Sequence, residues 1–373
     1  MASALKSLKV KYNGRYVGTL AMMKNGMVAF SYDDSWLEEG FSISPFSLPL
    51  EKKVFVPSKT YFGGLFGIFA DSLPDAWGRL LLDRLLLEKN MNRDITVLDR
   101  LALVGQSGMG ALEYEPDYEV VDAGTILDLD YVAAECGKIL KTEYSKDLDS
   151  IFKMAGSSGG ARPKILTTID DKSWIIKFAS QFDTNDIGLQ EYNYSICAKR
   201  CGIEMTETRL FQSNTCDGYF GTVRFDIGPR SRNIHIATVA ALLEADFRSP
   251  CLDYNDLFKL TRILTRENKN DIENMFRRMC FNVLAHNRDD HAKNFSFMYD
   301  EKSDKWKLSP AYDLTYSNTY WGEHTTSVDG NGKNPESKEL ISVGVGAGIK
   351  KDRCESLIDE IRGKVEEDLY EYL

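Results

Sequence analysis

Three polar residues in the last third of the chain have the types and the spacing that phosphoryl transfer needs. Residues 287–297 read NRDDHAKNFSF, so Asp289 lies five residues before Asn294, and Asp313 follows nineteen residues after Asn294. One carboxylate can orient an attacking hydroxyl, while an amide and a second carboxylate can hold Mg²⁺. These hard oxygen ligands suit an ion that shares its coordination shell with phosphates and water. The spacing therefore predicts a kinase and leaves Asp289 free of the metal.

The run alone does not decide which molecule accepts the phosphoryl group. Protein kinases carry H-R-D-x-x-x-x-N, and Arg288, Asp289 and Asn294 match it, whereas Asn287 replaces the histidine. Because His291 follows two residues after Asp289, the run also fits the D-x-H-x-x-N of lipid kinases. A lone motif of this kind is more often a polar loop that caps a turn or a helix.

A glycine-rich segment upstream has the composition of a phosphate-binding loop. Residues 155–164 read AGSSGGARPK and lie between a helical pattern and a strand pattern. Glycines let backbone N–H groups approach phosphate oxygens, and Arg162 and Lys164 add positive charge. The segment lacks the G-K-[ST] ending of a Walker A loop, and Pro163 stiffens it because proline fixes φ.

Two predicted strands follow this loop. Residues 165–169 and 173–178 are rich in β-branched and aromatic residues and flank a turn at 170–172. Lys177 on the second strand then lies beside the glycine loop, where a kinase keeps its phosphate-binding lysine. A helix near residues 189–201 carries Glu191, which could pair with Lys177. The glycine loop, the strand lysine and the catalytic run occur in the order that a kinase requires. This order favours one nucleotide site over three unrelated features.

In series, these motifs resemble those of the HipA-type toxin kinases of bacterial toxin–antitoxin modules over nearly the whole chain. Residues 69–75 resemble the family's F-x-x-L-L-P-D segment, and residues 101–112 resemble its L-A-x-x-G-x-x-x-x-G-A-L segment. Residues 157–164 resemble the S-x-x-G-A-x-x-K loop, and residues 223–226 resemble the R-F-D hinge. The catalytic run and residues 311–313 complete the order.

The resemblance implies a role for each matching residue. Asp289 would be the catalytic base, Asn294 and Asp313 the Mg²⁺ ligands, and Ser157 the autophosphorylated serine that switches the kinase off. Ser158 is the alternative to Ser157, and the hinge backbone would meet the adenine. The residues implied to bind ATP are Ser158, Gly159, Gly160, Ala161, Arg162, Lys164, Lys177, Val223, Arg224, Phe225, His291, Lys293, Asn294, Tyr312 and Asp313.

The resemblance also implies partners. Family members act on a protein, possibly an aminoacyl-tRNA synthetase, and are held by a HipB-type helix-turn-helix antitoxin. No such helix-turn-helix is visible in this sequence, so we expect the antitoxin to be another polypeptide. The net charge of −10 argues against a stand-alone nucleic-acid binder, whose binding face is usually basic. We therefore expect DNA to be contacted mainly through the partner.

Composition predicts a cytoplasmic protein that does not interact with membranes. The N-terminus lacks the apolar region of a signal peptide, and the sequence lacks the run of about 18 apolar residues that spans a membrane. The seven cysteines, an odd number without a CxxC motif, fit reduced thiols.

The patterns together predict an α+β protein in which a small β-plus-helix N-terminal domain precedes a bilobal protein-kinase-like core with a mainly helical C-lobe. The predicted boundaries are residues 1–120 for the HipA-type N-terminal subdomain, 121–226 for the kinase N-lobe and 227–373 for the C-lobe. We expect tight hairpins at 13–14 and 25–26, one helical stretch over 126–154, and a helix over 271–285 that leads into the catalytic run. The Gly-, Asn-, Ser- and Thr-rich loop at 322–337 is typical of a mobile segment.

Two other functions remain open at this point. A pseudokinase would bind nucleotide and act by sequestering a partner, although it would tolerate loss of Asp289, Asn294, Asp313 and Lys177, all of which are present. A kinase of the same chemistry could instead phosphorylate a small molecule or a lipid.

Overall fold

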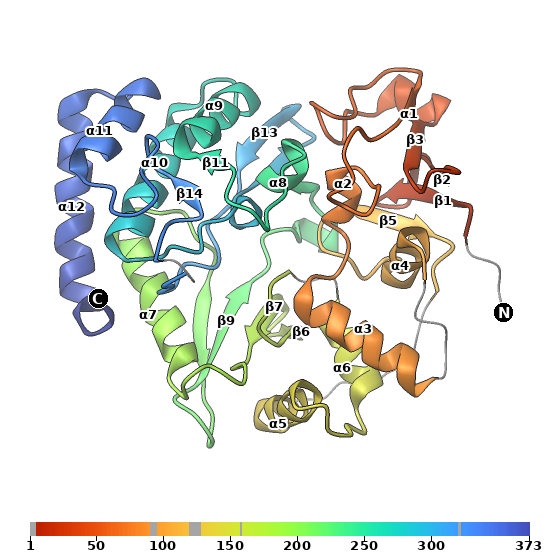
Figure 1. Ribbon diagram of the computed structural model, residues 1–373, viewed down its shortest axis with the longest axis horizontal. Coiled ribbons are helices and arrows are strands. Elements are labelled where there is room, and N and C mark those ends of the chain that lie inside the picture. Colours follow the sequence, from red (N-terminus) through yellow and green to blue (C-terminus); the bar gives the residue numbers. More distant parts are fainter. Residues whose placement is uncertain (1–4, 90–94, 119–127, 157–158, 320–321) are drawn as a thin grey trace. The chain divides into compact units, whose positions relative to one another are not determined.

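The chain forms two compact units. A computed structural model describes residues 5–89, 95–118, 128–156, 159–319 and 322–373 (Figure 1). The first unit comprises residues 1–188, 211–237 and 241–244, and the second comprises residues 189–210, 238–240 and 245–373. The three-domain boundaries after residues 120 and 226 remain predictions.

The first unit contains two antiparallel sheets and the helices that pack on them. Its strands are β1 (Ser7–Tyr12), β2 (Arg15–Met22), β3 (Val28–Tyr32), β4 (Val54–Phe55), β5 (Leu112–Glu115), β6 (Lys164–Ile169), β7 (Lys172–Lys177) and β9 (Tyr219–Val223). Its helices are α1 (Asp34–Glu39), α2 (Gly67–Ala70), α3 (Ala76–Glu88), α4 (Val97–Val104), α5 (Leu129–Leu140), α6 (Leu148–Ala155) and the 3₁₀ turn η1 (Pro229–Ser231).

The five-stranded sheet has the order β4-β3-β2-β1-β5 and begins with the two predicted hairpins. Asn13 and Gly14 have φ values of 46° and 79°, and Gly26 has a φ of 81°. These left-handed conformations suit tight hairpin turns, and asparagine and glycine adopt them at low cost. The alternating apolar residues of β1, which include Leu8 and Val10, are buried.

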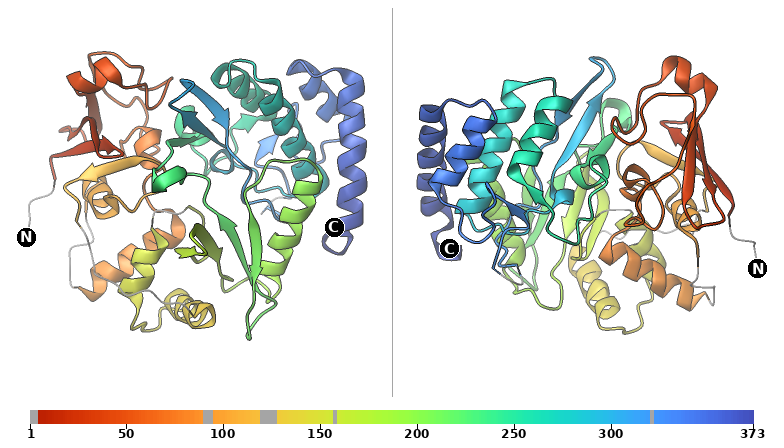
Figure 2. Two further views of the ribbon diagram at one scale, coloured as in Figure 1. Left: turned by 180° about the vertical axis from the view of Figure 1, so that it is seen from behind. Right: turned by 45° about the horizontal axis from the view of Figure 1, so that its top comes forward.

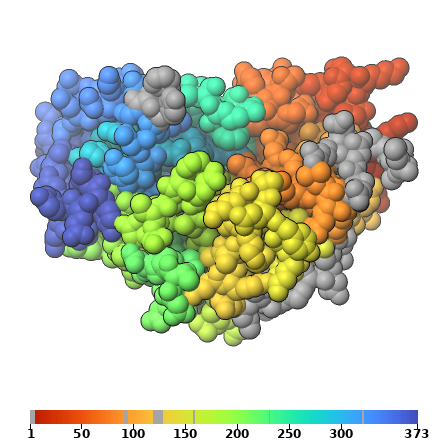
Figure 3. Space-filling view, turned by 60° about the horizontal axis from the view of Figure 1, so that its bottom comes forward, coloured from red at the N-terminus to blue at the C-terminus, as the bar shows by residue number. Residues whose placement is uncertain are grey.

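The second sheet of this unit supports the glycine loop. Strands β6, β7 and β9 are neighbours, and β6 and β7 form the predicted hairpin through Asp170 and Asp171, both with positive φ. Helices α3, α5 and α6 supply apolar side chains to one core with this sheet (Figure 1). The members of that core include Trp77, Leu81, Val132, Ile151, Ile165, Trp174, Ile176 and Phe178. Helices α5 and α6, coloured yellow, also form part of the molecular surface in Figure 3.

The segment predicted to be helical over 126–154 forms two helices in its described part, since α5 ends at Leu140 and α6 begins at Leu148. Residues 126–127 lie outside the described residues. Thr142 between them has a φ of 67°, which no helix accommodates. Asp128 caps α5 by accepting a hydrogen bond from the backbone N–H of Tyr131.

The second unit is mainly helical. Its helices are α9 (Tyr254–Leu264), α10 (Lys269–Leu284), α11 (Ser337–Gly346), α12 (Lys351–Leu369) and the short 3₁₀ turns η2 (Ala292–Asn294) and η3 (Tyr370–Tyr372). Its strands are β11 (Leu252–Asp253), β12 (Ser296–Asp300), β13 (Lys305–Leu308) and β14 (Thr326–Ser327). Four further elements include residues of both units: α7 (Ile187–Arg200), β8 (Thr208–Phe211), β10 (Ile236–Thr238) and α8 (Val239–Leu242).

Helix α10 is the central element of the second unit. It packs against α9, α11 and α12 (Figure 2), and its side chains Phe276, Met279 and Phe281 are fully buried. Asn268 caps its N-terminus through hydrogen bonds from the N–H groups of Asn270 and Asp271. The helix is therefore a rigid support for the loop that follows Leu284.

Within the described ranges, no helix combines the length and the apolar sequence that crossing a membrane requires.

Candidate active site

The catalytic run leaves the C-terminal end of α10 through a sharp turn. Ala285 is the C-cap of this helix, and His286 follows with a φ of 52°, the left-handed conformation that ends many helices. Burial, together with the neighbouring Arg288 and His324, lowers the pKa of His286, which therefore favours the neutral ring. This turn delivers residues 287–294 as an extended loop that ends in η2.

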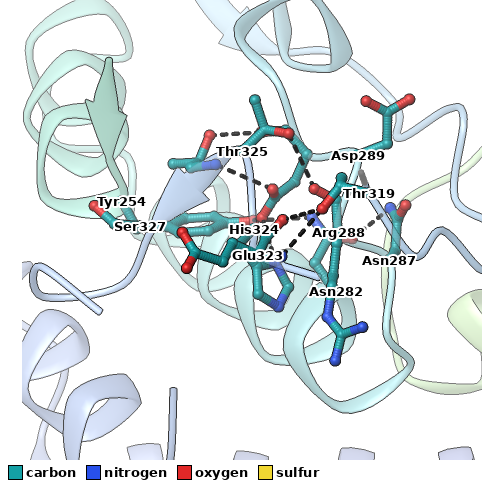
Figure 4. Close-up of polar contacts among 12 residues, drawn as sticks. Tyr254, Asn282, Asn287, Arg288, Asp289, Thr319, Glu323, His324, Thr325 and Ser327 are labelled. Atoms are coloured by element: carbon teal, nitrogen blue, oxygen red, sulfur yellow. Dashed lines mark hydrogen bonds and ion pairs between the residues drawn. The ribbon is translucent and has the colours of Figure 1, made fainter. Parts of the chain in front are cut away.

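Asp289 and Asn294 lie together on this loop, as the sequence predicts. The side-chain amide of Asn294 donates a hydrogen bond to the Asp289 backbone carbonyl over 2.6 Å. The Asp289 side chain is 57% exposed, and its carboxylate lies 3.9 Å from Nε2 of His291. In Figure 4 it points away from the buried polar side chains drawn beside it. An exposed, oriented carboxylate can receive a proton from an acceptor hydroxyl.

His291 and Lys293 are fixed by local contacts. Nδ1 of His291 accepts a hydrogen bond from the Lys293 N–H over 3.2 Å, so the ring caps η2. The Lys293 ammonium lies 4.5 Å from the ring centroid of Phe247, a cation–π contact, and the His291 ring lies 5.9 Å from the same ring. Phe247 was not predicted, and an isolated aromatic residue offers no motif that could have revealed it.

Asp313 is tied to the catalytic run through its neighbour. The hydroxyl of Tyr312, which directly precedes Asp313, donates to the backbone carbonyl of Lys293, which directly precedes Asn294, over 2.7 Å. Asp313 itself has a φ of 54°. Apart from glycine, asparagine and aspartate are the residues that most often adopt this left-handed conformation. The structure thus brings the two predicted metal ligands onto adjoining segments.

The donor set of these segments fits Mg²⁺. Because the Asn294 amide nitrogen donates to Asp289, its oxygen is the atom that can bind a metal, and Asp313 adds a carboxylate. In the described part of the chain, no group of three or more His, Cys, Asp and Glu side chains could hold an ion. Mg²⁺ in proteins is typically bound by one or two protein oxygens, and phosphates and water complete its coordination shell.

The glycine loop is docked on the N-terminus of α3 in the first unit. Ser157 and Ser158 lie outside the described residues. Beyond them, the Gly160 N–H donates to the Asp75 carboxylate over 3.3 Å, and the Gly160 carbonyl accepts from the Trp77 N–H over 3.3 Å. Gly160 has a φ of 98°, and a Cβ there would lie 2.7 Å from Nζ of Lys164. Only glycine fits this position without displacing the lysine.

Two predicted phosphate-binding lysines are cross-strand partners. Lys164 at the start of β6 pairs in register with Lys177 at the end of β7, so both side chains lie on one face of the hairpin. Lys164 is buried and donates to the Gly159 carbonyl, while the Lys177 ammonium lies 5.5 Å from the Phe220 ring centroid. Like charges directly opposite each other are unfavourable. Two lysines on one face of a hairpin are suited to binding an anion such as a phosphate.

Arg162 is held by a carboxylate that was not predicted. Its guanidinium donates two hydrogen bonds to Asp183, over 2.9 and 3.0 Å, and Asp183 also accepts from the Ser180 N–H over 2.8 Å. Burial raises the pKa of Asp183, but the hydrogen bonds from Arg162 and Ser180 outweigh it, and the pKa lies below its usual value. Ala161 next to Arg162 is exposed.

The hinge segment is anchored at Arg224. Its N–H donates to the Ser173 carbonyl over 2.8 Å, and its guanidinium binds the fully buried Asp226 through two hydrogen bonds of 2.9 and 2.6 Å. The Gly110 N–H donates to the same carboxylate over 2.7 Å. This geometry makes the Arg224 side chain a structural element, and adenine contacts of Val223 and Phe225 stay predictions.

Asp290 is the main residue of the site that sequence reasoning missed. It is fully buried and accepts hydrogen bonds from Tyr254, His324 and the backbone of Thr326. A signal was available, because consecutive side chains of an extended segment point to opposite sides. Of the adjacent Asp289 and Asp290, one side chain was therefore expected to point into the protein interior.

The predicted residues fall into two sets. Those from residue 159 to 225 belong to the first unit, whereas those from residue 291 to 313, with Asp289, belong to the second. Glu191 belongs to the second unit and Lys177 to the first, so their pairing stays a prediction.

Comparison with known sequences identifies the family. The family model described as HipA-like C-terminal domain matches residues 156–369, more than half of the chain, and the model described as HipA N-terminal domain matches residues 8–115. The chain belongs to the HipA family. The resemblance drawn from its motifs is confirmed.

Curated relatives and one solved structure agree with this assignment. The chain is 25% identical over 404 residues to the protein named Putative kinase Y4mE of Sinorhizobium fredii, covering 95% of this chain and 90% of that protein. It is 26% identical to Putative kinase Y4dM of the same organism, covering 86% and 80%. HipA of Shewanella oneidensis, solved with HipB and its operator DNA, has a TM-score of 0.72 and 18% identity, covering 98% and 90%. This likeness confirms the predicted α+β fold class.

Proposed function

We propose that this HipA-family protein is a kinase that transfers the γ-phosphoryl group of Mg²⁺·ATP to a serine or threonine hydroxyl of a protein. The observation that carries the proposal is the hydrogen bond from Tyr312 to the Lys293 carbonyl, which joins the segment of Asp313 to the run of Asp289 and Asn294. Family membership and the two relatives named as kinases support it.

In the proposed reaction, Asp289 accepts the proton of the acceptor hydroxyl. The hydroxyl oxygen forms a bond to the γ-phosphorus, the bond from that phosphorus to the bridging oxygen breaks, and ADP leaves. Mg²⁺ held by Asn294 and Asp313 would neutralise charge on the phosphates. Lys164, Lys177 and the glycine backbone would bind the phosphate oxygens.

Calorimetry can test the nucleotide role of each set of residues. We expect the affinity for Mg²⁺·ATP to fall in Lys177→Met and in Asp313→Asn. Asp304→Asn, at the exposed turn between β12 and β13, is the matched control and should leave binding unchanged. Wild-type affinity for Mg²⁺·ATP in either of the first two variants would contradict the nucleotide role of the substituted residue.

We also propose autophosphorylation of Ser157, with Ser158 as the alternative acceptor. A phosphoserine carries a charge of roughly −1.5 to −2 and would compete with ATP phosphates for the same donors. Peptide mass spectrometry after incubation with Mg²⁺·ATP should locate the phosphate there in the wild-type protein and not in Asp289→Asn. Phosphorylated protein that binds ATP as well as unmodified protein would rule out an off-switch.

The partner we propose is a HipB-type helix-turn-helix antitoxin. The related HipA was solved in complex with HipB and operator DNA, and the net charge of −10 of this chain favours DNA contact through a partner. An aminoacyl-tRNA synthetase is the first substrate to assay, because the family resemblance implies it. Co-purification with the product of a neighbouring short helix-turn-helix gene would test the partner.

A further inference from the structure

The buried carboxylate of Asp290 holds two segments of the second unit together. Its side chain accepts hydrogen bonds from the Tyr254 hydroxyl over 2.9 Å, Nδ1 of His324 over 3.0 Å and the Thr326 N–H over 3.1 Å. Three donors around one buried carboxylate compensate the cost of removing its charge from water. The side chain of the adjacent Asp289 is 57% exposed and points away from Tyr254 and His324 in Figure 4.

The group extends into the helical core. The Asn282 side chain on α10 donates to the Tyr254 hydroxyl over 2.9 Å, and the Asn287 side chain donates to Asn282 over 2.9 Å. Burial and the nearby Asp290 charge raise the pKa of Tyr254 well above its usual value. The hydroxyl therefore stays protonated and remains a donor to Asp290. Tyr254 on α9 and Asn282 on α10 thus connect Asp290 and Asn287 of the catalytic run to two helices.

The segment that follows Asp313 is paired with the catalytic run on two sides. The Arg288 N–H donates to the Ser317 carbonyl over 3.2 Å, and the Arg288 carbonyl accepts from the Thr325 N–H over 3.0 Å. The Thr326 hydroxyl donates to the Asp290 carbonyl over 2.5 Å. Thr326 also pairs in parallel with Leu252 between β14 and β11.

In protein kinases, the corresponding segment after the metal-binding aspartate must be ordered for activity, and phosphorylation often orders it through new ion pairs. Here the buried Asp290 carboxylate accepts hydrogen bonds from His324 and from the Thr326 N–H of this segment. We propose that Asp290 is a positioning residue that anchors residues 322–327 to the run of Asp289, so that the acceptor site is built without phosphorylation of that segment. The link to the acceptor rests on the proposed kinase function.

Hydrogen–deuterium exchange tests the anchoring directly. In Asp290→Ala, the amides of Thr325 and Thr326 should exchange about tenfold to a hundredfold faster, the ratio that corresponds to leaving buried donors without an acceptor. Amides of α12 should keep their wild-type exchange rates. Unchanged exchange at Thr325 and Thr326, or an equal rise in α12, would overturn the proposal.

A pair of substitutions at His324 gives a test that leaves Asp290 in place. Asparagine can present its side-chain N–H close to the position of the imidazole Nδ1, whereas leucine cannot donate. We expect His324→Asn to retain slow exchange at Thr326 and His324→Leu to lose it. Equal exchange in these two variants would show that the hydrogen bond to Asp290 is not what anchors the segment.

Activity then separates positioning from nucleotide binding. Labelling of the protein's own chain from γ-labelled ATP should fall about tenfold or more in Asp290→Ala, while the calorimetric Kd for Mg²⁺·ATP stays within about twofold. A parallel loss of ATP affinity would overturn a role in acceptor positioning. Hydrogen–deuterium exchange can be measured without kinase activity. Wild-type protein that transfers no phosphate would therefore refute the proposed function, and the exchange rates would still decide whether Asp290 anchors the segment.

Discussion

At the scale of single residues, two adjacent aspartates have opposite surroundings. The Asp289 side chain is 57% exposed, whereas the Asp290 side chain is 0% exposed and surrounded by donors. The same side-chain chemistry therefore serves two purposes in neighbouring positions. Asp289 is suited to proton transfer, which needs access to an acceptor, and Asp290 is suited to holding structure. Asp313, which has a left-handed φ of 54°, is a third case in which a carboxylate is placed by its backbone.

Substitution of Asp313 tests the metal site. We expect Asp313→Asn to weaken Mg²⁺-dependent ATP binding about tenfold or more, because a neutral amide replaces a charged ligand of a hard cation. Binding measured by calorimetry in EDTA should be similar in the variant and the wild type. If the variant showed the wild-type dependence of ATP affinity on Mg²⁺ concentration, the metal would be held elsewhere.

At the scale of elements, the glycine loop and the β6–β7 hairpin form one cationic unit. The loop contacts α3 through Asp75 and Trp77, while Lys164 and Lys177 face the same side of the hairpin. The hairpin carries both lysines, and the Lys164 ammonium donates to the Gly159 carbonyl of the loop, so phosphate affinity should depend on how the loop is held. Two substitutions examine this dependence.

Gly160→Ala should reduce ATP affinity by displacing the Lys164 ammonium, which lies 2.7 Å from the added Cβ, and should cost about 1–3 kcal/mol in backbone strain. Gly14→Ala is the matched control, with a φ of 79° and open space around its Cβ. Both variants should lose similar stability in thermal unfolding, but only Gly160→Ala should lose ATP affinity. Equal ATP affinity in the two variants would argue against a phosphate role for this loop.

The ion pair of Arg162 and Asp183 makes part of the stability dependent on pH. Because the pKa of Asp183 is lowered in the folded protein, its contribution is present above the unfolded-state pKa of about 4 and is lost as pH falls through the folded value. The wild type should therefore exceed Asp183→Asn in unfolding free energy at pH 7, and the difference should shrink below pH of about 4. Arg162→Met should give the same trend in urea titrations. A difference that is constant from pH 7 to pH 3 would contradict the assignment.

At the scale of the whole molecule, local patterns predicted the elements well and the supporting contacts poorly. The hairpins at Asn13-Gly14 and Asp170-Asp171 and the helix before the catalytic run follow from turn chemistry and apolar spacing. The break between α5 and α6 was missed because apolar periodicity continues across it. Partners distant in sequence, such as Asp183 for Arg162 and His324 for Asp290, carry no local signal.

The loop at 322–337 shows the same limit. Its composition predicts a mobile segment, yet Thr325 and Thr326 are hydrogen-bonded to the catalytic run. The composition of such a segment shows that it has no strong preference for helix or strand. It does not reveal the tertiary hydrogen bonds that the segment makes. The catalytic and metal assignments came from motif spacing, the full set of nucleotide-binding residues came from the family resemblance, and all of these roles stay predictions.

The central claim is that this chain transfers phosphate from ATP to protein hydroxyls through Asp289. The most direct test incubates wild-type protein and Asp289→Asn with γ-labelled ATP and Mg²⁺, alone and with a cell extract, and identifies labelled amino acids. We predict phosphoserine or phosphothreonine with the wild type, and a loss of roughly 10²-fold or more in Asp289→Asn, which should still bind ATP. ATP binding without label would indicate a pseudokinase, and label only in small molecules or lipids would indicate another acceptor. Either result, or equal labelling by Asp289→Asn, would contradict the claim.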